Sequence, residues 1–269
     1  MIGLEQARVI ERVEVRAWAD LFAAAPAAAA EAIGLAGREC GDGYLVSAPG
    51  IGTAMFNRTV GLGMSSPVSD AELDAIFSHY DGRGGSFEID LCPLARPEDL
   101  SHRLAARGFA APYQHVKWVR GIQAAPPQAW TLRLERVKPR QALEFATIAA
   151  AGFATGLPAA RDWLAASVGR PGWTHYVTWE GDKPVGCGAM FVSEDGAWLG
   201  FDSTREGQRQ KGSQSLVISA RIRDAAAAGC RGVSADTGPN RPDMDASAWR
   251  NLQRAGFVAA YERKCWMRA

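Results

Sequence analysis

The chain has 269 residues, of which 47% are hydrophobic and 22% charged, proportions typical of folded globular proteins and not of disordered, collagen-like or coiled-coil chains. Its 30 basic and 29 acidic side chains give a formal net charge of +1, so no general electrostatic attraction draws it to nucleic acid or to a membrane surface. The sequence has no secretion signal and no apolar run of 18 residues. We therefore expect a cytoplasmic protein with neither a nucleic-acid nor a membrane partner.

The cysteines and histidines show no ligand spacing. The five cysteines are scattered and never form a Cys-x-x-Cys pair, and the four histidines lie far apart. This pattern argues against a disulfide framework and against a structural zinc ion. We predict that the cysteines are small buried side chains and that the protein has no metal site.

The first half contains a strand-like segment, FNRTVGLGM, at residues 56–64. Ser69 and Glu72 follow it with the S-x-x-E spacing of a capping box, in which the two residues satisfy the backbone amides at the start of a helix. We therefore predict a helix that begins directly after Ser69.

An internal repeat joins the middle of the chain to its end. Residues 104–120 and 252–268 share seven identical positions at an offset of 148 residues, including Tyr113 with Tyr261 and Trp118 with Trp266. Each copy is a short amphipathic segment that ends at Gly-Phe and continues with alternating polarity, which indicates a helix, a glycine stop and a strand. The repeat predicts two domains derived from one ancestral unit.

The segment GIQAAPPQA at 121–129 is small, uncharged and rich in proline, which is typical of a linker. We therefore divide the chain into a first domain at 1–120 and a second at 130–269.

The second domain shows a regular succession of elements. We predict a strand at 130–137, a helix after Pro139 and a second helix at 161–168. Strands at 173–180, 184–192 and 197–204 follow, then a polar loop, a helix from Gly212 to Gly229, a strand at 232–238, a helix and the repeated final strand.

The loop before Gly212 predicts a phosphate site. A strand, a glycine-containing loop and the start of a helix bring free backbone N–H groups and the positive end of the helix dipole together. A P-loop is excluded because Ser213 and Gln214 stand where Lys and Ser/Thr are required. A dinucleotide fingerprint is excluded because neither Gly186-x-Gly188 nor Gly61-x-Gly63 precedes a helix.

The segment Arg209 to Gln214 resembles the [RQ]-x-x-G-x-[GA] motif of the GNAT superfamily of acyl-CoA-dependent N-acyltransferases, with Gln214 in the last position. The order of elements over 130–269 is similar to that family as well. The resemblance implies an α/β (α+β) fold of two tandem GNAT-like domains, each a mixed, mostly antiparallel twisted sheet flanked by helices. The first domain lacks the motif and is expected to be a degenerate copy that no longer binds CoA.

The resemblance implies an N-acetyltransferase that uses acetyl-CoA as co-substrate, without a metal. A primary amine on a small molecule or peptide would attack the thioester directly in a ternary complex. The alternative is a catalytically silent acyl-CoA-binding sensor or scaffold, and the oligomeric state stays open. The residues expected to contact CoA are Asp202, Ser203, Thr204, Arg209, Gln210, Lys211, Gly212, Ser213 and Gln214.

The candidate general bases are Asp202 and then Asp236, because burial at a strand end raises the pKa of a carboxylate toward neutrality. Each is otherwise a hydrogen-bonded aspartate that ends a strand. The tyrosine that protonates the leaving thiolate in the family is replaced here by Leu252. Tyr261, Ser247 or water are the possible substitutes.

Overall fold

The computed structural model describes residues 2–153, 155–239 and 246–268. In the first half the elements are α1 (Leu4–Ala23), α2 (Ala27–Ile33), β1 (Ala36–Cys40), β2 (Gly43–Ser47), β3 (Asn57–Val60), α3 (Asp70–Asp81), β4 (Glu88–Leu91), α4 (Leu100–Ala106) and β5 (Phe109–Gly121). In the second half they are β6 (Arg133–Arg136), α5 (Ala142–Gly152), α6 (Pro158–Ala166), β7 (Trp173–Glu180), β8 (Lys183–Ser193), β9 (Gly196–Thr204), α7 (Ser213–Ala227), β10 (Gly232–Thr237), α8 (Ser247–Arg254) and β11 (Val258–Arg268).

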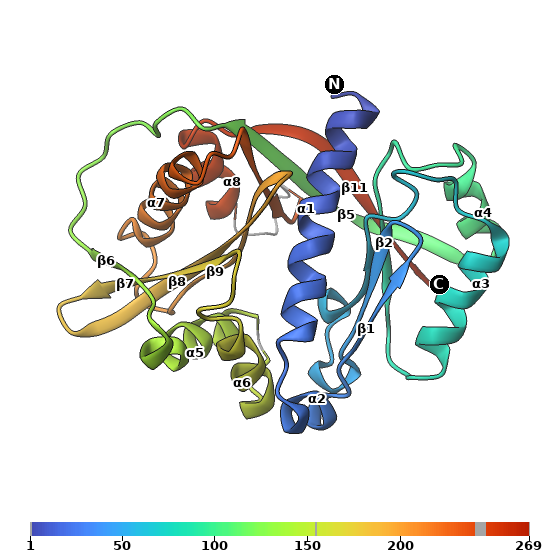
Figure 1. Cartoon of the computed structure of the whole chain (residues 1–269), viewed down its shortest axis with the longest axis horizontal. Coiled ribbons are helices and arrows are strands. Elements are labelled where there is room, and N and C mark those ends of the chain that lie inside the picture. The colour runs from blue at the N-terminus through green and yellow to red at the C-terminus, as the bar shows by residue number, and fades with distance from the viewer. Residues whose placement is uncertain (1, 154, 240–245, 269) are drawn as a thin grey trace.

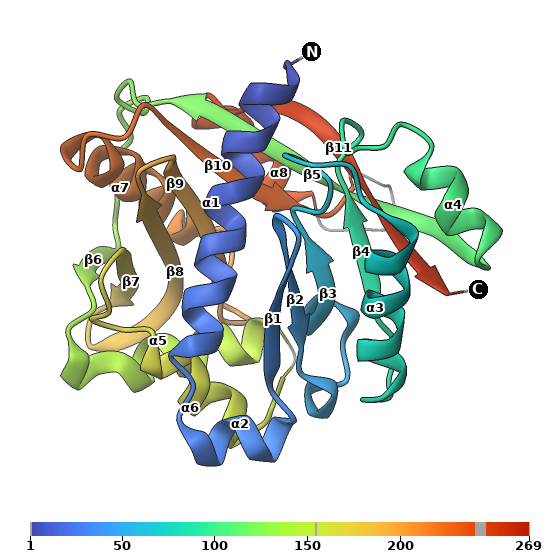
Figure 2. The same cartoon turned by 45° about the vertical axis from the view of Figure 1, so that its right-hand side comes forward.

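The described strands form one mixed sheet that runs through both halves (Figure 1, Figure 2). Its eleven strands lie in the order β1-β2-β3-β4-β11-β5-β10-β9-β8-β7-β6. We expected a separate sheet for each domain, and in this respect the structure differs from the prediction. The α+β class and the mixed, mostly antiparallel pairing are as predicted.

The two halves are joined because they exchange their last strands. β5 ends the first half but pairs with β10 of the second, whereas β11 ends the second half and pairs with β4 of the first. The two exchanged strands also pair with each other, antiparallel, over most of their length. They are the two copies of the repeat, and Gly108 and Gly256 before them both have the positive φ expected of a glycine that ends a helix.

The helices cover both faces of the sheet. Along β8, Cys187, Ala189 and Phe191 pack with α1, α5 and α6, while Met190 between them packs with α7 and α8. Adjacent strand residues point to opposite faces, so α1 shares its face with α5 and α6, and α7 and α8 cover the other face. Helix α1 crosses the sheet where the halves meet (Figure 2).

Two local predictions are confirmed by the structure. Ser69 and Glu72 form the capping box at the start of α3, with the Ser69 hydroxyl accepting from the Glu72 amide at 3.2 Å. The five cysteines are all buried and free. None of the described helices is both long and apolar enough to cross a membrane.

Candidate functional site

The start of α7 presents uncapped backbone amides. Gly212, in the left-handed conformation at φ +82°, precedes the helix and makes no side-chain cap, so the first-turn amides face outward. The buried hydroxyl of Ser213 instead contacts the Thr178 hydroxyl at 2.7 Å, which fixes the helix on the sheet. Gly186 allows this close approach, because a Cβ there would lie 2.1 Å from the Ser213 Oγ.

The sheet opens beside this helix start. β9 and β10 are parallel and pair only from Ala197 to Leu199 and from Val233 to Ala235, after which the described residues of the two strands are no longer paired. A register irregularity lies next to this point in the β8–β9 ladder, and Phe201 adopts a positive φ of 57°. The divergence leaves backbone groups of β9 available to a ligand placed between the strands.

A polar cavity of about 610 Å³ occupies the space between the α7 start, the end of β9 and α8. Eight of the nine residues predicted to contact CoA line this cavity: Asp202, Ser203, Thr204, Arg209, Gln210, Gly212, Ser213 and Gln214. The ninth, Lys211, does not line it, because its ammonium group pairs with Glu180 at 2.7 Å.

Helix α8 contributes residues that sequence reasoning missed. Arg250, Asn251 and Arg254 line the polar cavity, and the Asn251 amide donates to the Gln214 side chain at 2.7 Å. The i, i+4 spacing of the two arginines places them on one side of the helix, a signal that was available in the sequence. They add positive charge where a phosphate-bearing ligand would lie.

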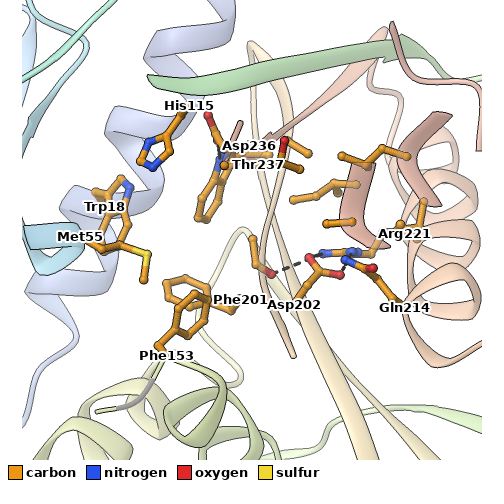
Figure 3. A pocket seen from close by; sticks show the side chains of 18 of the residues that line it. Trp18, Met55, His115, Phe153, Phe201, Asp202, Gln214, Arg221, Asp236 and Thr237 are labelled. Carbon is orange, nitrogen blue, oxygen red and sulfur yellow. Dashed lines mark hydrogen bonds and ion pairs between the residues drawn. The ribbon is translucent and has the colours of Figure 1, made fainter. Parts of the chain in front are cut away.

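A second, mainly apolar pocket of about 280 Å³ adjoins the first and shares Asp202, Gln214 and Ala248 with it. The second half supplies most of its lining residues, among them Trp198, Leu252, Phe153 and Phe201, and the last two are labelled in Figure 3. The first half supplies the others, which are Trp18 on α1, Met55 and Phe56, Arg58 on β3 and His115 on β5. These first-half residues could not be predicted from the sequence, because their place in the wall depends on how the halves pack.

Asp202 lies where the two pockets meet and is held by an ion pair. Arg221 Nη1 donates to Asp202 Oδ2 at 2.8 Å, and Nη2 contacts the other carboxylate oxygen. Arg221 is 1% exposed and also donates to the Ala189 and Gly200 carbonyls beside the irregular part of β9. Both oxygens of this candidate base are therefore engaged, and the pair fixes the shape of the strand.

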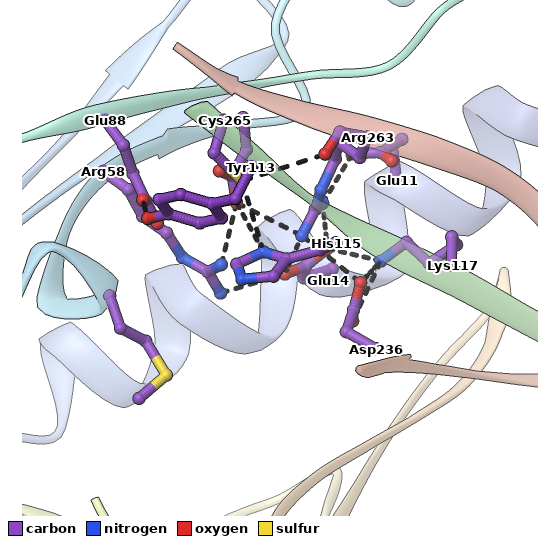
Figure 4. A network of polar contacts seen from close by, with 12 residues as sticks. Glu11, Glu14, Arg58, Glu88, Tyr113, His115, Lys117, Asp236, Arg263 and Cys265 are labelled. Carbon is purple, nitrogen blue, oxygen red and sulfur yellow. Dashed lines mark hydrogen bonds and ion pairs between the residues drawn. The ribbon is translucent and has the colours of Figure 1, made fainter. Parts of the chain in front are cut away.

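Asp236 lines only the apolar pocket. Its carboxylate accepts from the Trp198 indole at 3.0 Å and pairs with Lys117 at 2.9 Å and Arg263 at 3.3 Å. These contacts place it at the edge of a buried charge network beneath α1 (Figure 4). Burial alone would raise the pKa of Glu14 in that network, but Arg263, Lys117 and Arg58 overcome it and hold that pKa well below its usual range.

The structure places the candidate acids for protonating the thiolate in different surroundings. Leu252 is buried and lines the apolar pocket, so no hydroxyl stands at the position of the family's tyrosine. Tyr261 points into the charge network, where its hydroxyl donates to Glu11 at 2.6 Å. Ser247 lines the polar cavity.

Comparison with known proteins gives structural matches only. No protein-family model matches the sequence, and no curated protein matches it either. The GCN5-related N-acetyltransferase from Kribbella flavida is similar over 96% of this chain and 95% of its own, with a TM-score of 0.66 and 13% identity. The GCN5-related N-acetyltransferase from Sphaerobacter thermophilus is similar over 73% of this chain and 66% of its own, with a TM-score of 0.59 and 13% identity.

A tandem GNAT protein from the clavulanic acid biosynthesis pathway is also similar, with a TM-score of 0.54 and 14% identity over 78% of this chain and 73% of its own. Similarity at such low identity establishes the fold and not the activity. The chain has the fold of the GNAT acetyltransferases, as the resemblance of its second half predicted.

Proposed function

We propose that the chain is an acetyl-CoA-dependent N-acetyltransferase that acetylates a primary amine carried on a small apolar body. The observation that carries the proposal is the meeting of two unlike cavities at Asp202. One is polar and lies at a helix start, and the other is apolar and lies between the halves. Two substrates bound in them would meet at the divergence of β9 and β10.

The polar cavity suits CoA. Its pyrophosphate would lie against the amides of Gly212 to Ser215, where the helix dipole favours negative charge. Arg250 and Arg254 border the same space. The pantetheine arm would follow the end of β9 toward Asp202, and the backbone amides of that strand would stabilise the oxyanion formed at the thioester.

The apolar pocket suits the acceptor. Its volume of about 280 Å³ is small, and aromatic rings from both halves contribute to its wall. Ligand pockets commonly span roughly 300–1,000 Å³, so a compact amine is favoured over an aminoglycoside or a folded peptide. Of the two aspartates in this pocket, Asp202 also borders the CoA cavity and Asp236 does not. The ammonium group of the acceptor would therefore bind beside Asp236.

In this arrangement the chemistry is mainly positioning. Asp236 takes a proton from the ammonium group, and the neutral nitrogen attacks the thioester carbonyl carbon. The tetrahedral intermediate collapses as its C–S bond breaks and its nitrogen loses a second proton, and this proton passes to the CoA thiolate through water or the Ser247 hydroxyl. Asp202 borders both pockets and is held by Arg221, and we assign it the role of a positioning residue.

A release assay for free CoA thiol, run with acetyl-CoA and a panel of amines, tests this function. Small arylalkylamines should be acetylated in preference to aminoglycosides and peptides. Asp236→Asn should lower kcat about 100-fold or more while leaving acetyl-CoA affinity unchanged. Asp195→Asn is the matched control, because Asp195 is an ion-paired aspartate outside both pockets.

Two results would count against the proposal. Acetyl-CoA binding without turnover of any amine would favour the silent sensor or scaffold, the alternative that Leu252 supports because it provides no acid. Preferred turnover of an aminoglycoside or peptide would preserve the reaction class and refute the assigned acceptor.

A further inference from the structure

Four side chains of metal-binding types meet beneath α1, and one of them, His115, also lines the apolar pocket. Glu88 and Asp90 on β4, Cys265 on β11 and His115 on β5 each offer one ligand atom, and these four atoms all lie within 4.8 Å of one another. Figure 4 shows three of them, Glu88, His115 and Cys265, which come from three neighbouring strands. The sequence indicated no metal site because these residues lack ligand spacing along the chain, whereas the exchanged strands bring them together.

The register explains the convergence. Cys265 stands opposite Asp90 on one side and Tyr113 on the other. Residues two apart on a strand share a face, so Glu88 lies beside Asp90, and His115 lies beside Tyr113. The group therefore belongs to the face that α1 covers.

Two carboxylate oxygens of the group accept no hydrogen bond within the described part of the chain. Glu88 is 0% exposed and Asp90 1%, yet Glu88 Oε1 and Asp90 Oδ1 make no hydrogen bond with any described residue. The other oxygen of each is engaged, by Tyr113 in Glu88 and by Arg58 at 2.7 Å in Asp90. Burying a carboxylate oxygen without a hydrogen-bond donor costs free energy. The two oxygens therefore point to a ligand that would bind at this group.

The surrounding charges do not balance. Five carboxylates face three cations beneath α1: Glu11, Glu14, Glu88, Asp90 and Asp236 against Arg58, Lys117 and Arg263. A divalent cation would reduce the excess.

We propose that Glu88, Asp90, His115 and Cys265 form a structural site for a divalent transition-metal ion of the zinc type. One thiolate, one imidazole and two carboxylates favour zinc or cobalt over magnesium or calcium, which prefer all-oxygen ligand sets. Tetrahedral zinc holds its ligand atoms roughly 3.3–3.8 Å apart, so side-chain shifts of about 1 Å would complete the site.

Binding releases a proton. In the metal-free protein Cys265 is a buried free thiol, because burial favours the neutral form. The incoming ion forms a bond to Sγ, the S–H bond breaks, and the proton passes to solvent. The bound ion would then link β4 and β5 of the first half to β11 of the second half, and so stabilise the strand exchange.

Cobalt titration of chelator-treated full-length protein tests the site without any acyl-transfer assay. Co²⁺ should bind in a 1:1 ratio and give a thiolate-to-cobalt charge-transfer band, and Zn²⁺ should displace it and raise the melting temperature. The same band should appear in Cys230→Ser, the matched control, because Cys230 is a buried free cysteine outside the group. Cys265→Ser should lose it.

Glu88→Gln keeps the shape of the side chain and should weaken Co²⁺ binding at least tenfold. If Cys265→Ser does not fold, the partly exposed His115 provides the second test, and His115→Ala should weaken Co²⁺ binding to a similar extent. Absence of the charge-transfer band from folded wild-type protein would overturn the proposal. So would a band that persists in Cys265→Ser, or unchanged affinity in both Glu88→Gln and His115→Ala.

Discussion

Two aspartates at the ends of neighbouring strands show how surroundings decide what a residue can do. The sequence ranked Asp202 before Asp236 as candidate base. In the structure both carboxylates are held by cations, Asp202 by Arg221 and Asp236 by Lys117 and Arg263, and only Asp236 belongs to the acceptor pocket alone. Neither the buried arginine nor the pocket boundary is visible in the local sequence. The choice between the two candidates therefore depends on tertiary packing.

Another single residue, His175, makes the stability of the fold sensitive to acid. Burial lowers its pKa from 6.5 to about 3, and its Nε2 lies 2.9 Å from the Ser167 hydroxyl. The unfolded chain binds the proton more readily, so the stability contributed by the neutral ring is complete above pH 6.5 and is lost as the pH falls toward 3. The free energy of unfolding should fall by up to about 1.4 kcal/mol per pH unit in that window because of this residue.

His175→Phe should flatten this dependence, because the ring still packs on Trp173 while Ser167 keeps its bond to the Leu164 carbonyl. Chemical denaturation at several pH values between 6.5 and 4 measures the slope. His102→Gln, at an exposed position, should leave the slope unchanged. Equal slopes in wild type and His175→Phe would show that burial of this ring does not govern the acid response.

At the scale of elements, the strands and helices of the second half were largely predictable. The strand predicted at 173–180 coincides with β7, and the helix predicted from Gly212 corresponds to α7, because alternation and glycine stops are local signals. The partner of each strand is not a local property. For that reason the exchange of β5 and β11, and the acceptor wall that Trp18 provides from α1, could not be derived from the sequence.

Helix α8 provides an element-scale test of the CoA cavity. Arg254→Ala should raise the Kd for acetyl-CoA roughly tenfold, corresponding to about 1.4 kcal/mol, because Arg254 borders the cavity. Lys211→Ala should change it less than about twofold, since that ammonium group pairs with Glu180 outside the cavity. Fluorescence titrations at low and high salt measure both, and a larger effect from Lys211→Ala would place the phosphates elsewhere.

At the scale of the whole molecule, the exchanged strands make each half dependent on the other. A fragment of residues 130–269 lacks β5, so β10 would lose its antiparallel partner, and a fragment of residues 1–125 lacks β11 beside β4. We expect each fragment alone to be aggregated or without a cooperative unfolding transition, and the two expressed together to form one folded complex. Circular dichroism and size-exclusion chromatography measure this.

A second-half fragment that folds alone as a monomer would contradict this dependence. Such a fragment would also support the prediction that residues 121–129 link two independent domains. The absence of a described helix or strand between Gly121 and Arg133 makes this segment the natural place to divide the chain.

The account as a whole rests on a single acetyl-CoA site in the second half. The corresponding helix of the first half, α3, begins with the Ser69–Glu72 capping box, so its terminal amides are already satisfied. Calorimetry of acetyl-CoA with wild type, Gly212→Asp and Gly207→Asp tests this most directly. Both glycines lie in the same loop and have a positive φ, so an aspartate at either position causes similar backbone strain. Only Gly212 lines the cavity, so only Gly212→Asp places a carboxylate there.

The expected result is one site per chain, abolished by Gly212→Asp and retained by Gly207→Asp, because a carboxylate at the helix start repels the pyrophosphate. Two sites per chain, no binding to the wild type, or equal affinity in Gly212→Asp and wild type would contradict the account.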